Sequence, residues 1–368
     1  MHHCCRSNNL REARRKSGYE PSAWRHYVWR EFSMSKKKKI KKKGRVMWGF
    51  IYVFTFVIAF SGAVAFKMKY NPFSKEFSVD WNDSVGMVHT DISYGSGEAN
   101  KFDLYVPADN SRKSYGLIVY LHAGGFTGGD KSGDVEILEW FCSKGYVTAG
   151  INYTLFSEKN PDANVYKQSV EIRESMPYVI AEAEKLGYHI NEMSIGGGSA
   201  GHALAMIYAY RDADKSPVPV KMTFGAVGPS CFYVEDWINM GANPNKPIPF
   251  DQNGDYQGIA DLFYVMSGNK ITNDMFKTGE YKELVKNISA EMWINENSVP
   301  TVVAYGSWDR VQSFRASLKL KQTMENNGID YQYFEMKHSG HGLQNDSKMY
   351  AEYMRKVLEY LDIYMPVK

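Results

Sequence analysis

The sequence contains few cysteines, four among 368 residues. Two of them, Cys142 and Cys231, stand far apart, and the other two are adjacent near the N-terminus. No pair has the spacing of a zinc site, so we expect neither a structural metal nor a disulfide framework. Glycine and proline occur in moderate amounts, and 14% of the residues are aromatic, which together exclude collagen-like and disordered proteins. The composition is that of a globular protein with a sizeable core.

Negative charge is nearly absent from the first 45 residues, which carry 15 lysines and arginines against 3 acidic residues. The remainder has 29 basic and 38 acidic residues, so a tail of net charge +12 precedes a part of net charge −9. The basic residues lie in one tail rather than on the globular part, which argues against a nucleic-acid-binding protein.

Charge of either sign is absent from residues 46–66, a run of 21 mostly apolar residues. This length spans a bilayer as a helix, and eight of the ten residues at 36–45 are basic, which predicts a cytoplasmic N-terminus. Ala63 and Ala65 also fit a cleavage site, so a cleaved signal peptide is the alternative. We favour an uncleaved anchor, because the apolar stretch is longer than most signal cores. Both interpretations place the rest of the chain outside the cytoplasm.

Four segments are therefore expected: a basic cytoplasmic tail at 1–45, a transmembrane anchor or signal at 46–66, a linker at 67–80 and a catalytic domain at 81–368. Within the last, short apolar runs alternate with amphipathic stretches, which is typical of an α/β fold with a mostly parallel central sheet flanked by helices. Strands are predicted at 102–106, 117–122, 147–153, 193–195, 222–227, 301–305 and 331–335. Helices are predicted at 134–144, 165–186, 200–210, 313–326 and 347–364.

Two features interrupt this alternation. Pro177 falls inside the second predicted helix, so we expect a kink or break near Met176. An aromatic- and methionine-rich interval at 231–297 separates two predicted strands, and loops of that length usually carry structure or function. A lid or pocket wall is one interpretation, and a locally packed excursion without a ligand role is the other.

The strongest functional signal is the G-x-S-x-G motif centred on Ser199, between a predicted strand and a predicted helix. A serine at such a tight turn projects its hydroxyl outward, and the flanking Gly197 and Gly201 let two backbones approach without a Cβ clash. Amide groups at the start of the following helix favour negative charge nearby. The pattern in this context indicates a nucleophile.

A second signal is the sequence His122-Ala-Gly-Gly-Phe126, directly after a predicted strand. Backbone amides in such a glycine-rich loop can point at an oxyanion. The alternative is an ordinary flexible turn.

An acid and a base follow downstream of Ser199. Asp309 comes just after one predicted strand, and His341 just after the last one. The chain order serine, aspartate, histidine is that of the α/β-hydrolase fold. His338 is the other candidate base, but it lies at the end of the strand, whereas His341 is in a glycine-flanked loop, so we favour His341.

Together these blocks resemble the α/β-hydrolase fold, specifically esterases of the hormone-sensitive-lipase and bacterial feruloyl/acetyl-esterase type. The resemblance covers residues 88–365 and includes a first hairpin at 91–107. It implies that Ser199 is the nucleophile, Asp309 the acid and His341 the base. The implied oxyanion donors are the backbone N–H groups of Gly124, Gly125 and Ala200.

The chain departs from the pattern at Ala123, where the family usually has glycine, and carries a bulky Trp308 beside the acid. The first departure concerns the geometry of the loop, and the second the shape of the pocket. Neither removes a catalytic group.

The expected activity is that of an exported or membrane-anchored serine hydrolase of carboxylic esters, which needs no metal and no cofactor. Its substrate would be a small-molecule or sugar-linked ester, and nothing in the sequence sets the oligomeric state. Two alternatives remain: a peptidase of the prolyl-oligopeptidase kind, and a catalytically silent hydrolase fold used for binding or adhesion.

Overall fold

The computed structural model describes residues 61–62 and 74–368. The chain divides into two units, Met1–Lys67 and Met68–Lys368, and the features below belong to the second. The predicted basic tail, and all of the predicted span at 46–66 except Ser61 and Gly62, lie outside the described residues. Among the described residues, no helix has both the length and the apolar character needed to cross a membrane.

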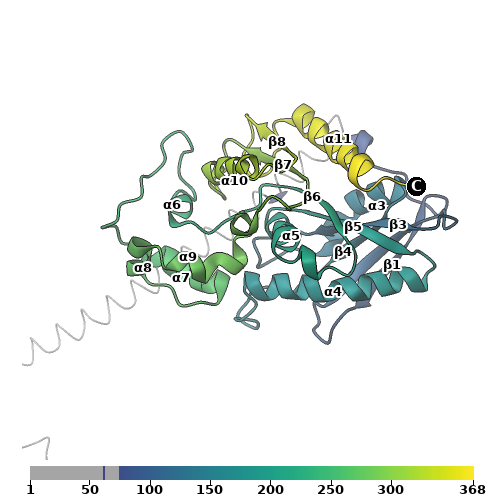
Figure 1. The fold of residues 1–368 in the computed structure, drawn as a ribbon, viewed down its shortest axis with the longest axis horizontal. Coiled ribbons are helices and arrows are strands. Elements are labelled where there is room, and N and C mark those ends of the chain that lie inside the picture. The colour runs from purple at the N-terminus through teal and green to yellow at the C-terminus, as the bar shows by residue number, and fades with distance from the viewer. Residues whose placement is uncertain (1–60, 63–73) are drawn as a thin grey trace, which may run out of the picture. The chain divides into compact units, whose positions relative to one another are not determined.

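An eight-stranded sheet forms the centre of the second unit, in the order β1-β2-β4-β3-β5-β6-β7-β8 (Figure 1). β2 is antiparallel to both of its neighbours, and every pair from β4 to β8 is parallel. The prediction of a mostly parallel sheet is therefore confirmed. The strands are β1 (Gly86–Ser93), β2 (Lys101–Pro107), β3 (Tyr115–Leu121), β4 (Val147–Ile151), β5 (Ile190–Gly198), β6 (Val220–Ala226), β7 (Thr301–Gly306) and β8 (Tyr331–Met336).

Helices cover both faces of this sheet, as predicted. Those that flank the sheet are α3 (Val135–Ser143), α4 (Val165–Lys185), α5 (Ala200–Arg211), α10 (Phe314–Asn326) and α11 (Ser347–Tyr364). On β6, the ring of Phe224 lies 5.4 Å from that of Phe141 on α3, whereas the next residue, Gly225, lies against His202 on α5. Because neighbouring residues of a strand face opposite sides, α3 and α5 cover opposite faces. Figure 1 shows α4 running below α5 and α11 above α3.

The helix α4 runs without interruption through Pro177, so of the predicted kink or break near Met176 the break is wrong. Pro177 is exposed, and the carbonyl group that loses its partner therefore lies on the solvent side of the helix. The opposite side buries a stripe that includes Ile172 and Val179 against the core. Packing of this stripe outweighs one missing hydrogen bond.

The interval between β6 and β7 contains short helices of its own. They are α6 (Val234–Trp237), α7 (Gln257–Ser267), α8 (Asn273–Thr278), α9 (Tyr281–Val285) and the 3₁₀ turns η4 (Lys286–Ile288) and η5 (Ala290–Trp293). The buried Phe263 ring makes edge-to-face contacts with Phe232, Trp237 and Phe276, so the segment packs around an aromatic cluster. Its two ends meet where the amide of Glu291 donates to the carbonyl oxygen of Ser230, at 2.9 Å.

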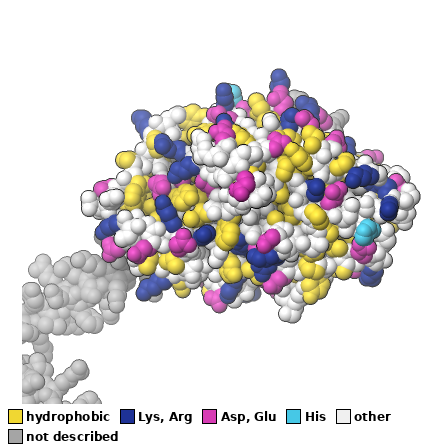
Figure 2. All heavy atoms as spheres, viewed as in Figure 1, with side chains coloured by type: hydrophobic (Ala, Val, Ile, Leu, Met, Phe, Trp, Pro, Cys, Tyr) yellow, Lys and Arg dark blue, Asp and Glu magenta, His cyan; other side chains and the backbone are white. Residues whose placement is uncertain are grey.

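Charged side chains of both signs are interspersed on the face of the molecule shown in Figure 2, with apolar side chains between them. This mixture agrees with the 29 basic and 38 acidic residues that follow residue 45.

Candidate active site

The turn between β5 and α5 carries Ser199 at its apex. Ser199 has φ +51° and ψ −117°, a conformation that L-residues adopt only when their surroundings enforce it. A Cβ on Gly201 would lie 1.9 Å from the carbonyl oxygen of Leu121, and one on Gly197 would lie 2.5 Å from the carbonyl carbon of Gly201. The two glycines of the motif are therefore required by close backbone packing around the strained serine.

The structure brings Ser199, His341 and Asp309 together from the ends of three different strands. The Oγ of Ser199 lies 2.8 Å from Nε2 of His341, and Nδ1 of His341 lies 2.7 Å from Oδ2 of Asp309. The side chains of His341 and Asp309 are 9% and 1% exposed. With its proton on Nδ1, the imidazole donates to the carboxylate and leaves Nε2 free to accept from the serine hydroxyl.

The second oxygen of Asp309 is held by its own loop. Its Oδ1 accepts hydrogen bonds from the backbone N–H groups of Val311, at 2.8 Å, and Gln312, at 3.0 Å. The carboxylate is therefore fixed on both oxygens, and its orientation toward His341 does not depend on the histidine alone.

The loops that carry the acid and the base are bonded to each other. The amide of Trp308 donates to the carbonyl oxygen of Ser339, at 3.0 Å. At Gly306 a Cβ would lie 2.3 Å from the carbonyl oxygen of Gly340, so only glycine permits this approach. Asp309 and His341 thus lie on two loops whose backbones are in direct contact.

His338, the alternative base, lies away from this arrangement. Its side chain is 79% exposed, and its Nδ1 lies 2.8 Å from Oδ1 of Asp346. Oδ2 of Asp346 also accepts from the backbone N–H of His338, at 2.9 Å, and from the hydroxyl of Ser339, at 2.6 Å. His338 and Asp346 therefore close the base of the loop at whose tip His341 lies.

The glycine-rich loop after β3 lies beside the serine turn, because a Cβ on Gly198 would be 4.0 Å from Cβ of Ala123. Gly124 and Gly125 have φ of +137° and +61°, and a Cβ on Gly124 would lie 1.9 Å from the carbonyl oxygen of Gly128. Within the described part of the chain, the amides of Gly124, Gly125 and Ala200 donate to no protein acceptor. They are available to a ligand.

Tyr153 and Asn152 hold this loop in place, and the sequence pattern did not indicate either of them as a site residue. The hydroxyl of Tyr153 donates to the carbonyl oxygen of His122, at 2.9 Å, and its ring stacks on the His122 ring at 4.3 Å. Burial lowers the pKa of His122, which keeps this imidazole neutral. Asn152 accepts from the amide of Lys131, at 2.7 Å, and donates to Asp130, at 2.6 Å. These partners are 21 to 31 residues apart in the sequence, so no local pattern indicates them.

With this geometry in view, the chain can be compared with known proteins. The family model BD-FAE matches residues 102–324, which is more than half of the chain. The chain belongs to the BD-FAE family.

Similar solved structures share its fold at low sequence identity. A truncated carbohydrate esterase from gut microbiota has a TM-score of 0.59 at 17% identity, over 77% of this chain and 98% of that one. Esterase B from Lactobacillus rhamnosis has a TM-score of 0.58 at 16% identity, over 85% and 93%. An esterase from Thermogutta terrifontis has a TM-score of 0.57 at 17% identity, over 78% and 95%. The predicted α/β-hydrolase fold is confirmed, and the family match confirms the predicted enzyme class of carboxylic-ester hydrolases.

Sequence relatives with assigned activity match only in part. Kynurenine formamidase of Salmo salar is 33% identical over 119 residues, which is 32% of this chain and 37% of that protein. The enzyme of the same name from Danio rerio is 30% identical over 139 residues, or 36% and 44%. The match therefore spans less than half of either relative.

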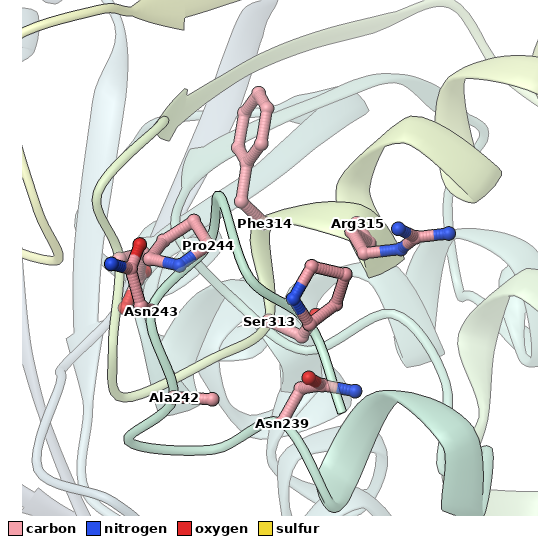
Figure 3. A pocket seen from close by; sticks show the side chains of 9 residues that line it. Asn239, Ala242, Asn243, Pro244, Ser313, Phe314 and Arg315 are labelled. Atoms are coloured by element: carbon pink, nitrogen blue, oxygen red, sulfur yellow. The ribbon is translucent and has the colours of Figure 1, made fainter. Parts of the chain in front are cut away.

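A pocket lies next to Asp309, between the loop after α6 and the start of α10 (Figure 3). Its empty volume is about 240 Å³, and part of that volume is open to solvent. Its lining residues are Asn239, Ala242, Asn243, Pro244, Pro247, Asp309, Ser313, Phe314 and Arg315. Neither Ser199 nor His341 lines this pocket, so we do not assign it as the substrate site.

Apolar side chains are exposed on two loops that are hydrogen-bonded to each other. The amide of Gly241 donates to the carbonyl oxygen of Arg310, at 2.7 Å, which joins the insertion to the acid loop. Met240 and Trp308 flank this contact in sequence and are 47% and 45% exposed. Trp308 is fixed, since its indole N–H donates to the carbonyl oxygen of Lys337, at 3.1 Å. In the described residues, no group of three or more His, Cys, Asp or Glu side chains is arranged to hold a metal ion.

Proposed function

We propose that this protein hydrolyses carboxylic esters through an acyl-enzyme formed on Ser199. The observation that carries the proposal is the continuous hydrogen-bonded relay from Ser199 through His341 to Asp309, with distances of 2.8 and 2.7 Å. A serine hydroxyl is a weak nucleophile unless a base takes its proton, and the base needs a carboxylate to hold its tautomer. In this arrangement His341 is the base and Asp309 supplies the carboxylate.

In the proposed reaction His341 Nε2 accepts the proton of Ser199 as Oγ attacks the ester carbonyl carbon. Asp309 stabilises the resulting imidazolium and stays ionised. His341 then gives the proton to the leaving alcohol, and the acyl group remains on Ser199. Water, deprotonated by the same histidine, hydrolyses the acyl-enzyme and returns the free serine.

The negative charge on the carbonyl oxygen would be held by the amides of Gly124, Gly125 and Ala200. Their lack of protein acceptors supports this role. So does the position of Ala200 as the first residue of α5, because helix N-termini favour negative charge. Loss of one such donor typically costs about 3 kcal/mol of transition-state stabilisation.

For the substrate we propose a small-molecule or sugar-linked ester. Support comes from the exposed aromatic and apolar side chains on the joined loops and from the similarity in fold to a carbohydrate esterase. A formamide is the second candidate, because two kynurenine formamidases are 33% and 30% identical to parts of this chain. Formyl transfer to Ser199 would use the same residues.

We further propose that the catalytic domain works outside the cytoplasm, tethered by residues 46–66 or released from them. The uncharged run of 21 residues after a basic stretch supports this. Membrane fractionation after alkaline carbonate washing, with Ser199 labelled by a fluorophosphonate, distinguishes the two forms. Label in the pellet indicates an anchor, and label in the medium indicates a cleaved signal.

The catalytic proposal is tested with the variants Ser199→Ala, His341→Gln and His338→Gln, assayed on a series of short acyl esters and on an aryl formamide. Ser199→Ala and His341→Gln should lose at least about a thousandfold in kcat, since the triad acts as a unit. His338→Gln is the matched control in the same loop and should stay within a few-fold of the wild type.

Full turnover by Ser199→Ala, or equal losses in the two histidine variants, would refute the assignment. A wild-type protein that neither reacts with a fluorophosphonate nor turns over any of these substrates would favour the silent binding fold instead.

A further inference from the structure

His202 lies one turn of α5 after Ser199 and takes no part in the relay. It is fully buried, and its Nδ1 accepts a hydrogen bond from the amide of Gly228, at 3.1 Å. Burial lowers the pKa of His202 to about 3, so the imidazole is neutral and keeps its acceptor lone pair at ordinary pH. The side chain thus ties the helix behind the nucleophile to the segment after β6.

That segment is strained and packs directly on the serine turn. Val227 has φ +52°, which is rare for a β-branched residue. The amide of Ser199 donates to the carbonyl oxygen of Ala226, at 2.8 Å. A Cβ on Gly228 would lie 2.8 Å from the carbonyl oxygen of Ser199. The strained turns at Ser199 and at Val227 are therefore in direct contact, and the position of one limits the position of the other.

Three hydrogen bonds hold the second turn in place. The amide of Val227 donates to the carbonyl oxygen of Ala304, at 2.9 Å, and the hydroxyl of Tyr305 donates to the carbonyl oxygen of Gly228, also at 2.9 Å. Both of these partners belong to β7. The third bond, from Gly228 to His202, connects the turn to the helix that begins at the nucleophile.

We propose that His202 is a positioning residue for the nucleophile: by accepting the Gly228 amide it holds the turn 226–228 against the serine turn and so fixes Ser199 Oγ in line with His341. This inference rests on the proposed function, since it assumes that Ser199 is the nucleophile. Loss of the acceptor leaves the Gly228 amide buried without a partner, and the turn has to shift to satisfy it. Ser199 shifts with it, because its amide is bonded to Ala226.

The test compares His202→Leu with His202→Asn in the full-length protein. Leucine fills a similar volume without an acceptor, whereas the Oδ1 of asparagine stands close to where Nδ1 stood. His202→Leu should lose about ten- to a hundredfold in kcat with KM little changed, since a displacement of about 1 Å at a reacting group costs this much. His202→Asn should keep kcat within about threefold, because it restores the acceptor.

Rates are expressed per folded molecule, with the folded fraction taken from thermal melts, and the rate of fluorophosphonate labelling of Ser199 is measured in parallel. A purely structural role would lower the melting temperature of both variants and leave kcat per folded molecule unchanged. That result, or equal losses of kcat in both variants, overturns the inference.

Should His202→Leu fail to fold, Tyr305→Phe carries the test, because it removes a single hydroxyl from the same turn. A lower kcat at unchanged KM supports the inference, and an unchanged kcat overturns it. Failure of the proposed function appears separately, as full activity in Ser199→Ala.

Discussion

Asp134, at the N-terminus of α3, carries a carboxyl oxygen that is buried and, within the described residues, has no hydrogen-bond partner. Burial, with a further contribution from the charge of Asp130, raises the pKa of Asp134 to about 7, from an ordinary value of 3.8. Between these two values the folded protein binds a proton that the unfolded chain releases. Stability should therefore fall as the pH rises from about 4 to about 7.

The size of the effect follows from the shift. A pKa difference of about 3 corresponds to at most about 4 kcal/mol of lost stability above pH 7. The residue as a whole is only half-buried and stands at a helix N-terminus, where the dipole favours a negative charge. About 2 kcal/mol is therefore the expected net effect. Asp134→Asn removes the charge and should stabilise the protein by this amount at pH 8, but hardly at pH 4.5.

Urea denaturation of wild type and variant at both pH values measures the difference directly. Glu296→Gln is the matched control, because Glu296 is exposed and makes no hydrogen bond or ion pair with the described residues. Its effect should stay within about 0.5 kcal/mol at either pH. A gain for Asp134→Asn that is the same at both pH values, or a loss at pH 8, would refute the reasoning.

Two further predictions concern close packing and a buried charge. Gly201→Ala should abolish activity and lower stability, because its Cβ would lie 1.9 Å from the Leu121 carbonyl oxygen, whereas Gly198→Ala, with its nearest contact at 3.8 Å, should fold and keep most of its activity. Equal behaviour of the two in thermal melts and ester assays would contradict this. Lys131→Met leaves the buried Asp103 carboxylate, 2.9 Å away, without its cation, and should cost about 3 kcal/mol in urea denaturation. A loss below about 1 kcal/mol would show that solvent reaches the pair.

The fold could be predicted, and the candidate site residues proposed, because both leave local patterns in the sequence. The central strands are mostly apolar and buried, as β4 shows with all five residues buried, and such runs are recognisable wherever helices cover both faces of a sheet. The serine turn requires Gly197 and Gly201, so its motif is visible in five residues. Asp309 and His341 were proposed from chain order, and in the structure His341 contacts both Ser199 and Asp309.

Other features could not be predicted, for identifiable reasons. β1 is an edge strand with mostly exposed side chains, so it has no apolar pattern, and only the family resemblance pointed to it. The break expected at Pro177 follows from the local sequence alone, and packing of α4 against the core outweighs that local effect. The contact of His202 with Gly228 joins residues 26 positions apart and depends on the arrangement of β6 beside α5. Such long-range support leaves no trace in a single sequence.

The junction between Ser230 and Glu291 has a consequence for how this enzyme could be altered. Since the segment between them leaves the sheet and returns at one point, its length can change at a small entropic cost, which grows only with the logarithm of loop length. Ser199 precedes this junction and Asp309 follows it, each just past the end of a strand of the sheet. Exchange of the segment for another one would therefore leave Ser199, Asp309 and His341 in register with one another.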